Sequence, residues 1–92
     1  MLQYNISFPI HENTTSGGGA YNDWNDLFEI RRLLQEDLQN MNGVECLGAG
    51  TFLQGGGAFD IDIEARSNKK QIIQAYLTSF AKKNKLKNLE MF

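Results

Sequence analysis

Two segments of the chain alternate strictly between apolar and polar residues, and this pattern limits the possible folds more than any other feature. In residues 2–10 (LQYNISFPI) and 58–65 (AFDIDIEA), every second side chain is apolar. A period of two is typical of a β-strand with one buried and one exposed face. The rest of the chain must therefore supply a second layer that covers the apolar face of a sheet.

Two further segments have the 3.6-residue apolar period of a helix that covers such a face. The first follows Asn22 or Asp23, either of which can cap it, and stops at Asn42-Gly43. The second is capped by Ser67 or Asn68 and runs to about residue 84. The apolar positions are Trp24, Leu27, Phe28, Ile30, Leu33, Leu34, Leu38 and Met41 in the first helix, and Ile72, Ile73, Tyr76, Leu77, Phe80 and Ala81 in the second.

A glycine hairpin at residues 55–57 joins the strand 58–65 to a less regular strand at 44–54. Gly48 and Gly50 interrupt the alternation of that strand, which indicates a β-bulge. Pairing of Leu53 with Phe59 would place Phe52 on the outer face. The same register would turn three side chains inward: Leu47, Ala49 and Thr51.

A short final strand is expected within residues 87–92, so the element order is β-α-β-β-α-β. This order predicts an α+β fold, the ferredoxin-like two-layer sandwich, with a four-stranded antiparallel sheet and two helices on one face. Its two central strands would be 2–10 and 58–65. The 92 residues suffice for one such domain, residues 1–92, and not for a second core.

Charge is distributed unevenly along the chain. Residues 1–65 carry a net charge of −8, whereas residues 66–92 carry +6. The basic residues lie in a patterned helix, and we interpret them as its solvated surface. Asp60, Asp62 and Glu64 form an outward row of carboxylates on a central strand, where they would repel phosphate. We therefore expect no nucleic-acid partner.

Composition also excludes several classes of protein. No apolar run is long enough to span a membrane, and no secretory leader is visible, so a cytoplasmic protein is expected. The single cysteine, Cys46, excludes an internal disulfide. We expect no metal and no cofactor. No serine or cysteine stands in a recognisable nucleophile motif, so no catalytic residue is assigned and an enzyme is not favoured.

A glycine-rich end is predicted where the loop after the first strand meets the glycine hairpin. Residues 11–20 (HENTTSGGGA) read as a flexible loop. The fold would bring residues 11–24 and 54–58 together, as a candidate ligand site. Its residues are His11, Asp23, Trp24, Gly17, Gly18, Gly19, Gly55, Gly56 and Gly57. Asp23 and Asp26 disfavour a bound phosphate there, and Trp24 is expected to be a core anchor rather than a ligand platform.

The segment GVECLGAGTFLQGGGAFDIDIEA, residues 43–65, resembles a pattern in small bacterial ferredoxin-like proteins of uncharacterised or immunity type. The resemblance implies a ferredoxin-like fold and a bacterial, immunity-type role, and it assigns no functional residue. Together with the charge pattern it favours a non-enzymatic domain that docks a basic protein through Asp60, Asp62, Glu64 and Phe52. The alternative is a small-molecule-binding regulatory or enzyme-like domain with its site at the glycine-rich end, residues 11–24 and 54–58. The chain would be a monomer or a weak homodimer that pairs through the edge strand 44–54.

Overall fold

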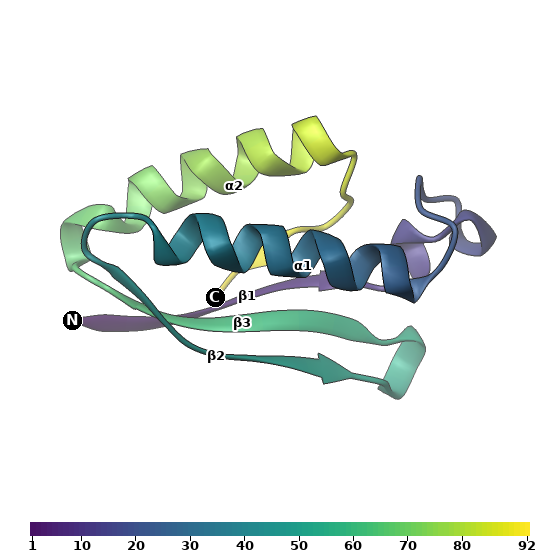
Figure 1. Ribbon diagram of the computed structural model, residues 1–92, viewed down its shortest axis with the longest axis horizontal. Helices are drawn as coiled ribbons and strands as arrows, with labels where there is room; N and C mark the ends of the chain where they lie inside the picture. Colours follow the sequence, from purple (N-terminus) through teal and green to yellow (C-terminus); the bar gives the residue numbers. More distant parts are fainter.

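The computed structural model describes all 92 residues and places two helices on one face of a four-stranded antiparallel sheet (Figure 1). The strands are β1 (Leu2–Pro9), β2 (Val44–Phe52), β3 (Ala58–Ala65) and β4 (Glu90–Met91), and the helices are α1 (Trp24–Gln39) and α2 (Lys70–Asn84). The strand order is β2-β3-β1-β4. The predicted ferredoxin-like sandwich is confirmed, with β1 and β3 in its centre.

The central pair β1–β3 keeps one register from Leu2 opposite Ala65 to Pro9 opposite Ala58. The amide of Ile10 still donates to the Gly57 carbonyl at 2.9 Å. Hydrogen-bonded and non-bonded pairs alternate in an antiparallel ladder, so the nitrogen of Pro9 points away from β3. Proline is tolerated at this position because no hydrogen bond to β3 is required of it.

The register predicted for β2 is wrong by two residues. Thr51, and not Leu53, lies opposite Phe59, and β2 ends at Phe52. The predicted bulge is present between Cys46 and Gly48. It displaces the intervening Leu47, which is exposed instead of pointing into the core. Ala49 opposite Ile61 is on the helix side as predicted, and Phe52 lies on the outer face.

Helix α1 begins as predicted with Asp23, whose carboxylate accepts hydrogen bonds from the amides of Asn25 at 3.0 Å and Asp26 at 3.3 Å. Gly43 ends the turn after the helix with a φ of +82°. The buried side chains of α1 are Leu27, Ile30, Leu34 and Leu38. The other predicted apolar positions of this helix are at least partly exposed, because they flank the face that rests on the sheet.

Helix α2 starts differently from the prediction. Residues Ser67–Lys69 form a 3-10 turn, and no side chain caps the helix that follows at Lys70. Its buried residues are Ile73, Leu77 and Phe80, whereas Ile72 is exposed. The hydroxyl of Tyr76 donates a hydrogen bond to Asp37 and so connects the two helices.

The core lies between the helices and the sheet. Fifteen buried apolar residues form one cluster, to which β3 contributes four side chains: Phe59, Ile61, Ile63 and Ala65. These are the inward positions that the alternation of residues 58–65 predicts. Neither helix has the length and apolar character needed to cross a membrane.

Candidate functional site

Both helices lie on one side of the sheet and leave the other side uncovered (Figure 1). The uncovered side carries a concentration of carboxylates. Asp60, Asp62 and Glu64 point to this side from β3, as predicted. Glu45 of β2 lies opposite Glu64, and Glu90 of β4 lies opposite Ser7, so both share this side. We call these five carboxylates the acidic face: Glu45, Asp60, Asp62, Glu64 and Glu90. None of the outward strand positions is basic.

An asparagine on the neighbouring strand orients two of these carboxylates. The side-chain Nδ2 of Asn5 donates to Asp60 Oδ2 at 3.1 Å and to Asp62 Oδ1 at 2.8 Å. Both amide hydrogens are used, but an amide brings no positive charge. The one cation that interacts with this pair is Arg31 of α1, whose guanidinium feels the charge of Asp60. Asn5 is not among the predicted site residues, although its outward position on a central strand is visible in the alternation.

Two glycines leave the other side of these carboxylates uncovered. Gly48 lies opposite Asp62 and Gly50 lies opposite Asp60. A Cβ atom at Gly50 would lie 2.8 Å from Asp60 Oδ1, so the carboxylate rests against the bare backbone of β2. The glycines that make β2 irregular in sequence therefore make room for the outward aspartates.

Exposed aromatic rings lie beside the acidic face. Phe52 ends β2 with 61% of its surface exposed. Phe92 is 70% exposed, and its backbone exchanges two hydrogen bonds with Asn5, at 3.0 and 2.8 Å, which puts the ring on the same side of the sheet. Exposed aromatic groups next to charged ones are typical of protein interfaces. Phe52 is one of the predicted docking residues, whereas Phe92 is not.

The acidic face has no cluster of metal-ligating side chains, and the single cysteine lies on the other side of the sheet. No group of three or more His, Cys, Asp or Glu side chains is arranged to hold a metal ion. Cys46 lies on the helix side of β2, where its Sγ atom is 3.6 Å from the carbonyl oxygen of Gln35. Burial raises the pKa of the Cys46 thiol, which lowers the fraction present as the nucleophilic thiolate.

At the glycine-rich end, the two loops meet around His11 as predicted. A Cβ atom at Gly17 would lie 2.1 Å from the His11 carbonyl oxygen, and one at Gly56 would lie 3.3 Å from the His11 Cβ. Gly18 lies further along the loop, where its carbonyl accepts a hydrogen bond from Lys87 Nζ at 2.8 Å. A Cβ atom at Gly55 would meet nothing within 4 Å.

The loop predicted at residues 11–20 has local structure that the sequence pattern did not indicate. Residues His11–Asn13 and Thr15–Gly17 form two short 3-10 turns. Asn13 is fully buried, and its Nδ2 donates to the carbonyls of Pro9 at 2.7 Å and Lys87 at 3.1 Å. Gly19 is required beside it, because a Cβ atom there would lie 2.1 Å from the Asn13 carbonyl carbon.

Trp24 borders a hollow at this end and is not the core anchor that the sequence analysis expects. Trp24 is 55% exposed, whereas Leu27, three residues further along α1, is fully buried in the core. The hollow measures 510 Å³ and is lined by Ile10, Trp24, Thr51, Leu53, Gly56 and Gly57. Of the predicted ligand-site residues, only Trp24, Gly56 and Gly57 line it. Asp23 is engaged instead as the helix cap.

Comparison of the chain with known protein families, with curated proteins and with solved structures finds no match.

Proposed function

We propose that this chain is a non-enzymatic binding domain whose acidic face docks a basic protein. The observation that carries the proposal is the concentration of five carboxylates on the uncovered side of the sheet, without a basic side chain among the outward strand positions. A basic toxin would suit such a face, which is the immunity-type role that the resemblance of residues 43–65 implies. A polyanion such as a nucleic acid would be repelled by it.

Electrostatics supports a basic partner in two ways. Carboxylates held close together repel one another, and a cationic surface relieves that repulsion on binding. The lysines of α2, which include Lys82 and Lys83, lie in the helix layer on the other side of the sheet. This separation of charge would orient an approaching basic protein toward the acidic face and raise its association rate. The exposed rings of Phe52 and Phe92 would add apolar contact area.

The test compares two double variants that change the net charge equally. Asp62→Lys/Glu64→Lys reverses the centre of the acidic face, whereas Glu29→Lys/Glu36→Lys reverses two exposed carboxylates on α1. The native chain and each variant are immobilised and exposed to a native cell extract at low salt, and the retained proteins are identified. The association rate of each retained protein is then measured separately at a series of salt concentrations.

We expect one basic protein that binds the native chain and the α1 variant but does not bind the acidic-face variant. Its association should become slower as the salt concentration rises. Equal loss by both variants would show an effect of net charge alone and contradict a docking face. A retained partner without a basic surface would contradict it as well.

The hollow beside Trp24 supports a second candidate function, the binding of a small apolar molecule. An exposed indole ring and the side chains of Ile10 and Leu53 around a 510 Å³ space form a mostly apolar lining. Trp24 is the only tryptophan, so its fluorescence reports occupancy directly. Titration with a panel of aromatic and aliphatic metabolites should change this signal, and Leu53→Asp should abolish the change. A silent panel contradicts this second function and leaves the first untouched.

A further inference from the structure

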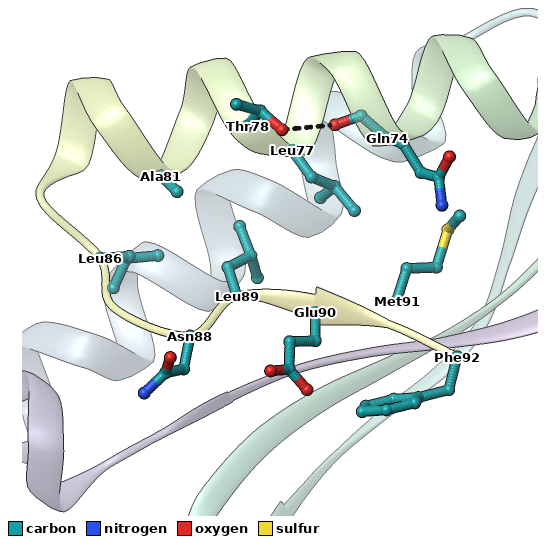
Figure 2. A pocket seen from close by; sticks show the side chains of 10 residues that line it. All are labelled: Gln74, Leu77, Thr78, Ala81, Leu86, Asn88, Leu89, Glu90, Met91 and Phe92. Carbon is teal, nitrogen blue, oxygen red and sulfur yellow. Dashed lines mark hydrogen bonds between the residues drawn. The ribbon is translucent and has the colours of Figure 1, made fainter.

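A groove that the proposed function does not use lies between α2 and the last strand (Figure 2). Its volume is 720 Å³. The helix contributes Gln74, Leu77, Thr78 and Ala81, and the C-terminal segment contributes Leu86, Asn88, Leu89, Glu90, Met91 and Phe92. Glu90 is the one charged residue among the ten. The remaining lining is mainly apolar, with three neutral polar side chains.

One wall of the groove is an unpaired strand edge. β4 is the outermost strand on this side of the sheet. Asn5 and Phe92 exchange two backbone hydrogen bonds. Met91, the residue before Phe92, therefore turns its N–H and C=O away from β1. The backbone of Leu89 receives no hydrogen bond from the rest of the chain either. Free backbone donors and acceptors beside an apolar groove are what strand addition by a peptide requires.

The side chains on the two sides of β4 differ in character. Leu89 and Met91 point toward α2, whereas Glu90 and Phe92 point away from it (Figure 2). Side chains of an added strand would alternate in the same way. Those on the inner side would enter the groove beside Leu77 and Ala81, and those on the outer side would lie next to Glu90 and the acidic face.

We propose that the groove takes an extended segment of the basic partner as an added strand, antiparallel to β4, with apolar residues inward and lysine or arginine outward. The inference rests on the proposed function in one respect: the basic character of the proposed partner is the reason to expect lysine or arginine on the outer side of the added strand. A second copy of this chain is a poorer match. Pairing β4 with β4 would bring two Glu90 carboxylates together, and the outward positions of β2, the other edge strand, offer no cation to Glu90.

The experiment titrates the full chain with a synthetic peptide, acetyl-Lys-Val-Lys-Leu-Lys-Val-Lys-amide, and follows the backbone amide resonances. An antiparallel added strand would direct the N–H groups of its inner, apolar residues toward β4. A second peptide therefore carries N-methyl groups on its three apolar residues, and a third carries them on the last three of its four Lys residues. We expect the first and third peptides to shift the resonances of residues 88–92, and the second to bind roughly tenfold or more weakly.

Two matched variants test the groove itself. Thr78→Trp places a large side chain in the groove from an exposed position of α2, and should weaken the first peptide by roughly tenfold or more. Ala75→Trp lies on the same helix, is exposed and lines no part of the groove, so it should bind the peptide like the native chain. Equal binding by both variants would overturn the inference.

The outcomes separate this inference from the proposed function. Peptide binding that ignores N-methylation and shifts residues 60–64 overturns strand addition and supports the acidic face. Binding that obeys the N-methyl pattern but is unchanged when every Lys of the peptide is replaced by Gln supports strand addition and overturns the basic character of the partner. Absence of binding overturns strand addition, and the capture experiment then decides the proposed function independently.

Discussion

The side-chain amide of Asn13 forms two hydrogen bonds with the backbone of Lys87, a residue 74 positions away in the chain. Its Oδ1 accepts from the Lys87 amide at 2.7 Å, and its Nδ2 donates to the Lys87 carbonyl at 3.1 Å. A third hydrogen bond reaches the carbonyl of Pro9. One buried asparagine thus fixes the loop after β1 to the segment that leads into β4.

Replacement of this asparagine should destabilise the fold strongly. Asn13→Ala leaves the Lys87 amide and two carbonyls without their partner in a buried site, and we expect a loss of about 2–4 kcal/mol in the free energy of unfolding. Chemical denaturation measures it. Asn22→Ala is the control, because Asn22 is exposed and makes no side-chain hydrogen bond. A similar, small effect of both substitutions would contradict the anchoring role of Asn13.

Two glycine substitutions should differ because of what surrounds each glycine. Gly19→Ala would place a methyl group 2.1 Å from the Asn13 carbonyl carbon, so the loop must shift, at a cost of about 1–3 kcal/mol. Gly48→Ala, in the bulged part of β2, meets nothing within 4 Å. It should leave stability unchanged or raise it slightly by restricting the unfolded chain. Thermal or chemical unfolding measures both variants, and equal stability of the two would contradict the importance of the contact at Gly19.

Neighbouring arginines on α1 should contribute unequally to stability. The guanidinium carbon of Arg31 lies 4.7 Å from the Phe28 ring centre and 5.0 Å from that of Phe59, and Nη1 donates to the Gly50 carbonyl at 2.6 Å. Burial lowers the pKa of Arg31, and the charge of Asp60 opposes this effect. Arg31→Met should cost about 1–2 kcal/mol, from the lost cation–π contacts and hydrogen bond.

Arg32→Met is the matched control for this experiment. Arg32 is exposed and pairs only with Glu29 and Glu36 on the surface of the same helix, where such pairs contribute little. Urea denaturation of the two variants should rank Arg31→Met as the less stable. An equal loss would mean that helical charge, which the substitutions change alike, matters more than the packing of Arg31 against the rings.

The parts of the fold that could be predicted from sequence are those in which neighbouring positions alone decide the structure. The alternation of residues 58–65 specifies β3, because each inward residue is apolar and each outward one is acidic from Asp60 to Glu64. Asp23 likewise identifies the start of α1 through a local cap. The acidic row was visible for the same reason, since residues two apart on a strand share a face.

The features that sequence reasoning missed depend on contacts between distant segments. The bulge at Leu47 changes which side chains of β2 face the core, and its position follows from the pairing with β3 rather than from β2 alone. The anchoring role of Asn13 is not visible in the loop sequence, because its partner Lys87 lies near the other end of the chain. The groove beside β4 also required the tertiary arrangement, because its walls come from α2 and the final strand.

The contact between Tyr76 and Asp37 predicts a loss of stability in alkaline solution. Burial raises the pKa of Tyr76 above its ordinary value of 10, and the hydrogen bond and charge of Asp37 raise it further. The unfolded chain therefore ionises this phenol at a lower pH than the folded protein does. Its contribution to folding is fully present below pH 10 and is lost as pH rises from there toward the higher pKa of the folded state.

Tyr76→Phe should remove this part of the pH dependence. At neutral pH the variant should lose about 1 kcal/mol, because the hydrogen bond between the helices is absent. Above pH 10 the difference in the free energy of unfolding between the variant and the native chain should shrink, because ionisation of the Tyr76 phenol removes its contribution to folding. Urea denaturation at a series of pH values measures both effects. A parallel course of the native and Tyr76→Phe curves would contradict the role of Tyr76.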